Sequence, residues 1–584
     1  MKRYFLLLII SMFVCLSADA QNYDVIEPEL QAILEEKGDE MISVNIILKS
    51  EINIKNLRSN VKNISDVKAH RQAVVSEFKR FSELSQKDIM TIIEAGKASG
   101  EIKDVKAHWL SNMITCTANK NFIYLLSTHH DVKTLGYNEM HYLLWDERSE
   151  DVEAQRAGIT PNVKYVNADN VWDSGYTGEG VLVAVIDTGV NFHEDLANNL
   201  WDGGEEYPNH GYNTFENSHD VSDGFDHGTH CAGIIVGDGT SGMKTGVAPD
   251  ATLMCVKVMN DGGSGNANTV CSGIEFAIEH GADVLNMSLG FPLATASSST
   301  KEALRQTCVN ALEANVAIIA AVGNDRMLNL TYPVPTNARI PAGCPPPWLH
   351  PDQQANAGGL SAVIAVGAID YQNNIADFSS KGPVTWQASS YADYPYIPGR
   401  EIGLIRPDLC APGVSIMSLD SKNSTGYKNM DGTSQAAPCV TGVVCLMLQK
   451  KPYLTPAQIC EALETTAKKL SETKSNDFGS GCVDAFLAMQ EIEDYQDVTG
   501  IEDNIYRKTA EIYPNPVDDI LSIATEIQID EIAIYDIYGR QALSQQVDKS
   551  TSQQVVNVAN LKAGVYFIRI KSDKENIVKR FVKN

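Results

Sequence analysis

Short apolar runs alternate with helical stretches through the middle of the chain. Continuous apolar strands separated by helices indicate a parallel sheet that helices cover on both faces. The pattern therefore predicts an α/β fold with a doubly wound parallel sheet over residues 151–490. Polar residues at the carboxyl ends of such strands are candidates for function, and Asp187, Ser288 and Asn324 occupy these positions. The apolar runs are "VLVAVID", "ATLMCVKVM", "ADVLNMSL", "VAIIAAVG" and "SAVIAVGAI".

Residues 21–150 mix the periods of strand and helix. "MISVNIILKS" alternates like a strand, and the stretch from Arg71 to Gly96 carries apolar residues at helical spacing. Strand, helix and strand patterns follow, the first of them in "HWLSNMITCTANK". The order β-α-β-β-α-β predicts a small α+β ferredoxin-like domain.

The chain changes character again near residue 491. Residues 491–510 are acidic and polar and show no periodicity, which is typical of a linker. Over residues 511–584, short alternating runs such as "EIAIYDIYG" and "VYFIRI" are broken by Gly, Pro and Asn. This pattern predicts a small all-β sandwich.

The first twenty residues have the composition of an export signal. Lys2 and Arg3 precede an apolar run from Phe5 to Leu16, and Ala18-Asp19-Ala20 follows. We expect a signal peptide over residues 1–20, cut after Ala20. The apolar run is too short to span a bilayer, and no later stretch predicts a transmembrane helix. The pattern indicates an exported protein.

Composition narrows the class of protein further. The formal net charge of −27 argues against a nucleic-acid partner, because phosphate contacts need a surplus of Lys and Arg. The twelve cysteines show no Cys-x-x-Cys spacing with interleaved His, so the sequence predicts no zinc site. Export permits disulfides, but the sequence leaves their connectivity open.

Asp187 lies in "VIDTGV", and Asp-Thr-Gly is also the signature of aspartic proteases. That chemistry needs two such loops on two lobes, because two carboxylates must share one proton. The second match, Asp173 to Gly175, lies one short segment before Asp187. Two lobes cannot form in that gap, so the aspartic-protease hypothesis fails.

A histidine and a serine follow Asp187 in a suggestive order. "DHGTHCAGI" places His227 and His230 at the start of an apolar helix, and "DGTSQAAP" places Ser434 at the start of another. A serine hydroxyl becomes a nucleophile when an imidazole removes its proton and a carboxylate orients that imidazole. The order Asp, His, Ser is the one found in subtilisin.

These segments resemble the subtilisin-like serine protease family. "AVIDTGV", "HGTHCAG", "NMSLG", "AAVGN", "FSSKGP", "APG" and "GTSQAAP" occur in the family's order between about residues 175 and 450. The resemblance implies that Asp187, His227 and Ser434 form a catalytic triad. It gives His230 a structural role and makes the Asn324 amide an oxyanion-hole donor.

The resemblance also implies where a substrate binds. An extended peptide would pair with two backbone segments, and small uncharged residues would wall the pocket for the side chain before the scissile bond. Such walls predict a preference for apolar or mixed side chains. The residues concerned are Ser288, Leu289, Gly290, Gly265, Ala321 and Gly323.

The family pattern requires no catalytic cofactor, and calcium is a possible ligand without an assigned site. The chain lacks the asparagine-rich loop that holds a tight calcium in many relatives, so the resemblance does not extend to that site. Asp220, Asp223 and Asp226 could bind calcium or could simply be solvated carboxylates. No metal-ligating residue is assigned.

The flanking domains have resemblances of their own. Residues 21–150 resemble a subtilisin-type propeptide, which implies that they template folding and inhibit the cleft, with processing between about residues 143 and 165. The motifs "YPNPVDDILSI", "VANLKAGVYFIRI" and "VKRFVKN" of residues 511–584 resemble a type IX secretion sorting domain. That implies export across the outer membrane, loss of this domain, and either release or attachment to the cell surface.

Together these features predict a secreted serine endopeptidase that hydrolyses proteins or peptides through an acyl-enzyme. Its partners would be protein substrates, its own propeptide and the type IX secretion machinery. An alternative is a surface adhesin or peptide-binding protein on a degenerate protease fold. An α/β-hydrolase esterase would need Gly-x-Ser-x-Gly, whereas Ser434 lies in "TSQ". The sequence leaves the natural substrate open.

Overall fold

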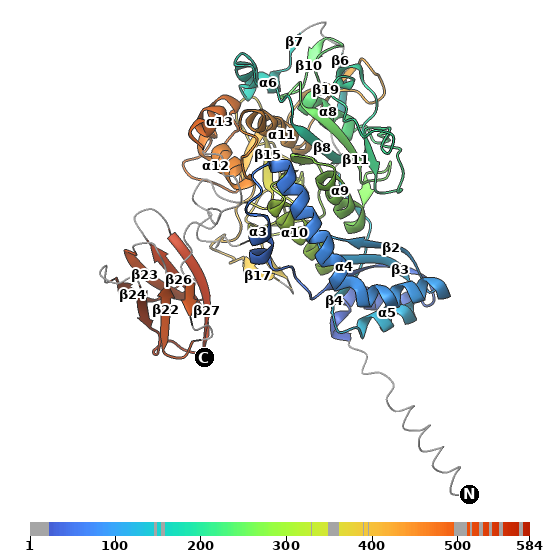
Figure 1. Ribbon diagram of the computed structural model, residues 1–584. Helices are drawn as coiled ribbons and strands as arrows, with labels where there is room; N and C mark the ends of the chain where they lie inside the picture. Colours follow the sequence, from blue (N-terminus) through green and yellow to red (C-terminus); the bar gives the residue numbers. More distant parts are fainter. Residues whose placement is uncertain are drawn as a thin grey trace, which may run out of the picture. The chain divides into compact units, whose positions relative to one another are not determined.

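The computed structural model describes residues 23–584 with short gaps (Figure 1). The chain forms two compact units, residues 1–500 and 501–584. The predicted signal peptide and Pro514, Asn515 and Pro516 lie outside the described residues. The gaps are 145–148, 153–157, 329, 348–360, 389–390, 395, 496–510, 514–516, 525–528, 537–539, 548–552 and 572–575.

The N-terminal region builds a four-stranded antiparallel sheet in the order β2-β3-β1-β4. The strand expected in "HWLSNMITCTANK" begins only at Met113, because Asn112 adopts a φ of 51° and turns the chain between two strands. The elements are η1 Tyr23–Val25, α2 Pro28–Glu36, β1 Ile42–Leu48, α3 Ile54–Val61, α4 Val67–Ser99, β2 Ile102–His108, β3 Met113–Ala118, α5 Lys120–Ser127 and β4 Val132–Tyr137.

A seven-stranded sheet in the order β18-β15-β14-β13-β8-β11-β9 forms the centre of the first unit. Every pairing between its strands is parallel, which confirms the predicted α/β class. All five apolar runs became strands of this sheet. The strands are β8 Leu182–Asp187, β9 Gly211–Asn213, β11 Thr252–Lys257, β13 Val284–Met287, β14 Ala317–Ala321, β15 Ile364–Ile369 and β18 Leu409–Pro412.

Helices cover both faces of this sheet. Along β8, Val183 and Val185 enter one hydrophobic core while Ala184 and Ile186 enter the other, as the period of a strand requires. Helices α8 and α11 lie in the first core, and α9 and α10 lie in the second. The helices are α6 Pro161–Tyr165, α7 Ala168–Trp172, α8 Gly228–Val236, α9 Ala267–Glu279, α10 Ser298–Glu313, α11 Thr433–Lys450, α12 Pro456–Thr466 and α13 Ala485–Glu491.

Several short ladders accompany the central sheet. Strand β5 pairs with β12, β6 pairs with β20, and β7 pairs with β10. The remaining elements are β5 His141–Tyr142, β6 Ser149–Val152, β7 Gly158–Ile159, η2 Glu194–Leu196, β10 Met243–Lys244, β12 Ser264–Gly265, η3 Arg326–Leu328, β16 Trp386–Ala388, β17 Tyr391–Tyr394, β19 Ile416–Leu419, β20 Tyr427–Met430 and η5 Ile492–Asp494.

The predicted linker begins too early. Helix α13 runs to Glu491, and η5 continues over Ile492–Asp494. The Ile492 side chain is fully buried in the core, and Lys451 Nζ donates to the Tyr495 carbonyl at 3.0 Å. The apolar residue at position 492 keeps the chain on the first unit, and residues 496–510 lie outside the described residues.

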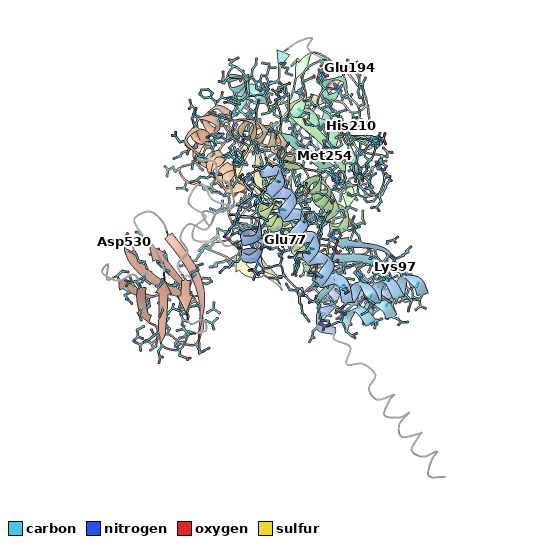
Figure 2. All side chains as sticks on the ribbon, in the orientation of Figure 1. Glu77, Lys97, Glu194, His210, Met254 and Asp530 are labelled. Carbon is cyan, nitrogen blue, oxygen red and sulfur yellow. The ribbon has the colours of Figure 1, made fainter. Side chains whose placement is uncertain are left out.

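The N-terminal region packs against α9 and α10 of the same unit, where α4 lies beside them (Figure 1). Phe78 and Val74 of α4 join the apolar core that contains both helices. Figure 2 labels Glu77 and Lys97 along α4. No helix among the described residues is long and apolar enough to cross a membrane.

Residues 511–584 form two antiparallel sheets, β21-β22-β25 and β24-β23-β26-β27. Side chains from both sheets share one apolar core that contains Leu521, Ile534 and Phe581. This arrangement confirms the predicted all-β sandwich. The strands are β21 Glu511–Tyr513, β22 Ile520–Ala524, β23 Glu531–Asp536, β24 Gln541–Gln546, β25 Gln553–Asn557, β26 Gly564–Lys571 and β27 Asn576–Lys583.

Candidate active site

Asp187 and His227 meet at the carboxyl end of the central sheet. Asp187 is the last residue of β8, and His227 caps the N-terminus of α8. The Asp187 Oδ1 to His227 Nδ1 distance is 2.6 Å, and both side chains are buried. A carboxylate in this position holds the Nδ1–H tautomer, so Nε2 becomes the basic atom of the ring.

A buried hydrogen-bond network fixes the Asp187 carboxylate and the start of α8. Thr188 N–H donates to Asp187 Oδ1 at 2.7 Å, and Thr188 Oγ1 donates to Asp223 Oδ1 at 2.8 Å. Asp223 Oδ2 accepts from Thr229 N–H at 2.9 Å and from Thr229 Oγ1 at 2.7 Å. Carboxylates are favourable at helix N-termini. The network therefore orients the first turn of α8.

Ser434 lies in the first turn of α11, on the same face of the sheet as α8. Its Oγ donates to the Ser288 carbonyl at 3.2 Å, and Ser288 Oγ donates to the Ser434 carbonyl at 2.7 Å. The Cys231 thiol contacts the Ser434 carbonyl at 3.5 Å, and its Sγ lies 3.9 Å from His227 Nδ1. The Cys231 thiol therefore lies close to both the His227 ring and the backbone of Ser434.

Asn324 follows β14 and faces the start of α11. Its Oδ1 accepts from Thr433 N–H at 2.9 Å and from Thr433 Oγ1 at 2.8 Å. A backbone N–H can only donate, so these contacts identify the oxygen of the amide. The Asn324 NH₂ group is therefore the end of the amide that can donate to another acceptor.

The predicted substrate-binding segments contact a piece of the chain itself. Gly265 pairs with His141, and Leu143 N–H donates to the Gly263 carbonyl at 3.0 Å. On the other side, Gly290 N–H donates to the Leu143 carbonyl at 3.0 Å. Residues at the end of the N-terminal region thus bind both segments that resemblance assigned to a substrate.

Three other predicted residues would offer a substrate backbone groups or open space, not a side chain. The Leu289 side chain is fully buried in the apolar core. Ala321 ends β14 and is also buried. Gly323 adopts a φ of 119°, and a Cβ there would lie 2.8 Å from Ser380 Oγ. Only glycine fits this position without strain.

A charged residue lies beside the expected small, uncharged pocket walls. The stem of Arg339 lies against Gly290 and Gly323, and its Nε lies 2.6 Å from Asp325 Oδ2. Sequence reasoning missed both residues. Asp325 directly follows Asn324, and that adjacency is the signal that could have pointed to a charged group here.

His230 and Cys231 are buried beside the site in uncharged forms. Burial lowers the pKa of His230 to about 3, and its Nε2 lies 3.2 Å from the Lys428 carbonyl. Burial raises the pKa of the Cys231 thiol to about 11. His230 is therefore a neutral hydrogen-bond donor, and Cys231 is a thiol rather than a thiolate.

The acidic residues considered for calcium have protein partners. Asp223 is 4 % exposed and accepts hydrogen bonds from Thr188, Thr229 and the Phe225 N–H. Asp226 pairs with Lys422 and lies 3.8 Å from Lys428 Nζ. Lysine cations pair with Asp226, and hydrogen-bond donors of the protein satisfy Asp223. Among the described residues, the one group with ligand atoms close enough for a metal is Asp187, His227 and Cys231, within 4.8 Å of one another.

The fold and the site define a serine hydrolase with an Asp-His pair at the end of a doubly wound sheet. The Subtilase family model matches residues 178–481, and the Secretion system C-terminal sorting domain model matches residues 511–584. The chain belongs to the subtilase family and is a subtilisin-like serine endopeptidase. Its sorting domain marks it for type IX secretion to the outside of the cell or the cell surface.

Sequence relatives agree with this assignment. Subtilisin DY of Bacillus licheniformis is 34 % identical over 330 residues, which are 56 % of this chain and 97 % of that protein. Subtilisin Savinase of Lederbergia lenta is 34 % identical over 326 residues, 56 % and 97 % of the two chains. Serine protease AprX of Bacillus subtilis strain 168 is 31 % identical over 339 residues, 53 % and 66 % of the two chains.

Proposed function

We propose that Asp187, His227 and Ser434 act as a catalytic triad in this endopeptidase, with Asn324 as an oxyanion donor. The buried contact of 2.6 Å between Asp187 Oδ1 and His227 Nδ1 carries the proposal, because it leaves Nε2 to act as the base. The position of Ser434 beside the Cys231 thiol supports the rest.

The reaction then runs through an acyl-enzyme. Ser434 Oγ attacks the scissile carbonyl while His227 Nε2 accepts its proton, and Asp187 stabilises the imidazolium. The Asn324 NH₂ group and the Ser434 backbone N–H donate to the oxyanion. His227 returns the proton to the leaving amine, and a water molecule hydrolyses the ester by the reverse sequence.

A fluorophosphonate probe tests this assignment, because it labels a serine only when a neighbouring base activates it. We expect the mature protein to be labelled at Ser434 and the Ser434→Ala variant to remain unlabelled. Ser418→Ala is a matched control, since Ser418 is also buried but its Oγ donates to the His230 carbonyl at 2.7 Å. Labelling that persists in Ser434→Ala would reject the triad.

The peptide backbone of a substrate should bind as the chain's own residues 141–144 do. Gly265 and Gly290 would pair with it on its two sides, with Ser288 and Leu289 completing the second segment. Ala321 and Gly323 would border the side chain before the scissile bond. The contacts of His141 and Leu143 with the same two segments support this mode of binding.

We assign residues 21–150 as a propeptide that inhibits the enzyme, after a signal peptide over residues 1–20. Support comes from the pairing of β5 with β12, which contains Gly265, and of β6 with β20, which shortly precedes Ser434. Self-cleavage would fall between residues 143 and 165. Mass spectrometry of the mature N-terminus tests it: Ser434→Ala should stay uncut, and identical processing of both proteins would reject self-cleavage.

No catalytic cofactor enters this mechanism, and calcium would act only on stability. The protein partners of Asp223 and Asp226 support a site elsewhere or none. We expect EDTA to leave kcat/KM of the mature enzyme unchanged at 25 °C. A loss of activity that calcium restores, with no change in thermal unfolding, would contradict this.

A further inference from the structure

Arg339 lies where the two borders of the substrate site meet. Its backbone N–H donates to the Val322 carbonyl at 3.0 Å, and Ile340 exchanges hydrogen bonds with Phe291 at 2.7 and 3.0 Å. The segment therefore runs between the chain that follows β13 and the chain that follows β14. Those two segments carry Gly290 and Gly323.

The side chain of Arg339 fills the space between these glycines. A Cβ on Gly290 would lie 2.8 Å from Arg339 Cβ, and a Cβ on Gly323 would lie 3.3 Å from Arg339 Cγ. Both glycines face the stem of this arginine. A large apolar side chain between them would have to displace it.

The guanidinium group is held rigidly. Nε donates to Asp325 Oδ2 at 2.6 Å, and Nη2 donates to Asp325 Oδ1 at 3.0 Å. Asp325 is 1 % exposed, and its own N–H donates to Ser380 Oγ at 2.8 Å. A bidentate pair of this kind fixes the orientation of the guanidinium plane. Asp325 engages the Nε and Nη2 groups, so Nη1 lies on the opposite edge of the guanidinium.

That edge already holds a peptide. Arg339 Nη1 donates to the Tyr142 carbonyl at 3.2 Å and to the Gly290 carbonyl at 3.1 Å. Tyr142 belongs to the stretch of chain that occupies the substrate segments. The arginine thus joins the enzyme's own binding segment to the backbone of the peptide lying on it.

We propose that Arg339 is a substrate-binding residue that sets the specificity of the cleft; the inference rests on the proposed function. It anchors a backbone carbonyl of the substrate, and it narrows the site for the side chain before the scissile bond. That site favours short side chains, best those ending in an oxygen acceptor such as Asn or Asp. It disfavours large apolar and cationic side chains, since the guanidinium repels a second cation.

The test uses the mature enzyme with peptide p-nitroanilides that differ only in the residue before the scissile bond: Asn, Asp, Ala, Phe or Lys. We expect wild-type kcat/KM to be at least about tenfold higher for Asn or Ala than for Phe, the usual scale for steric exclusion. In the Arg339→Ala variant, the ratio of kcat/KM for the Phe substrate to that for the Ala substrate should rise about tenfold. Arg339→Met keeps the volume, so it should still exclude Phe but lose the advantage of Asn and Asp over Ala.

Arg406→Ala is the matched control. Arg406 is also a buried arginine paired with an aspartate, Asp408, at 2.9 Å, but it donates to the Ala342 carbonyl rather than to the cleft-bound chain. Its loss should leave the substrate ratios within twofold of wild type. Arg339→Met also keeps the test decisive if Arg339→Ala fails to fold.

Wild-type cleavage after Phe as fast as after Asn and Ala would overturn the proposal. Ratios that stay within twofold in both Arg339 variants would overturn it equally. Fluorophosphonate labelling of each variant separates this failure from that of the triad. Labelled enzymes with unchanged ratios reject the role of Arg339 alone, whereas absence of label from the wild type rejects the proposed function.

Discussion

The two faces of the central sheet are covered in different ways. On one face, α8 and α11 bury apolar residues against α12 and α13, and their N-termini carry His227 and Ser434. On the other face, α9 and α10 are covered by the N-terminal region, which adds charged contacts at the helix ends. Helices of the catalytic domain alone cover the face that carries the candidate chemistry. The N-terminal region, which we propose is removed, covers the face with the charged contacts.

The charged contacts follow the dipoles of the helices. Arg71 is 2 % exposed and donates to the Gly281 carbonyl at 2.8 Å and the Ala314 carbonyl at 3.3 Å, just after α9 and α10. Glu27 accepts from Ser299 N–H at 2.6 Å, and Glu139 accepts from Ser297 N–H at 2.8 Å, both at the start of α10. A cation at helix C-termini and carboxylates at an N-terminus are each favourable. The N-terminal region therefore binds α9 and α10 in one orientation, and charged groups stabilise that orientation.

The largest expected effect is on catalysis, at the face of the sheet that α8 and α11 cover. Ser434→Ala should lower kcat by about 10⁶-fold, the loss known for removal of the corresponding serine in subtilisin. The second face should be unaffected, so the precursor should keep its N-terminal region bound. Peptide hydrolysis and gel filtration after protease-free purification measure the two. Residual activity within a hundredfold of wild type would place the nucleophile elsewhere.

On the second face, Arg71→Ala should destabilise the uncut precursor by about 3–5 kcal/mol, the usual cost of removing one partner of a buried ion pair. Asp283 loses a guanidinium at 3.0 Å, and two helix ends lose a donor. Chemical denaturation in a Ser434→Ala background measures it. Arg80→Ala on the same helix is the control, because the Arg80 side chain is 61 % exposed in its pair with Glu77. Equal effects of the two substitutions would contradict the importance of the helix ends.

Returning to the first face, Asn324→Ala should lower kcat by about 10²–10³-fold with little change in KM, on the scale of an oxyanion donor in subtilisin. The amide oxygen also holds Thr433, so a structural role would instead lower thermal stability. Asn324→Asp keeps the oxygen contacts but removes the NH₂ group, and it should lose kcat equally. Full activity in Asn324→Asp would exclude the oxyanion role.

The smallest expected effect is the pH dependence of binding between the N-terminal region and the rest of the enzyme. Burial, together with the nearby Glu139 carboxylate and against the hydrogen bond from Ser299, raises the pKa of Glu27 from 4.5 to about 7. Between pH 4.5 and 7, Glu27 is therefore protonated when the N-terminal region is bound and ionised when that region is free. The contribution of Glu27 to binding should be largest below pH 4.5, and its loss should weaken binding by about tenfold or more as pH rises through 7.

Glu27→Gln should flatten this dependence, because its amide cannot ionise. Retention of the cut N-terminal region on the enzyme, followed by gel filtration between pH 5 and 8, measures the effect. Glu29→Gln, on an exposed neighbouring carboxylate, is the control. An unchanged pH profile in Glu27→Gln would assign the dependence to another group.

Much of this arrangement could be predicted from the sequence because the signals are local. The apolar runs became the central strands, and Gly432 and His227 stand at the starts of α11 and α8, where the motifs placed them. The position of Arg339 could not be predicted, because it depends on a segment passing between two strand ends. The packing of Ile492 likewise depends on a distant surface, so its polar neighbours suggested a linker.

The ladders formed by β5 and β6 have a consequence for the order of the maturation reaction. Residues just before the proposed junction, and others inside its interval of 143 to 165, are already held on the same molecule that would cut them. Cutting in this arrangement is unimolecular, so its half-time does not change on dilution. A secreted precursor could then mature as a solitary molecule, however sparse it is in the medium.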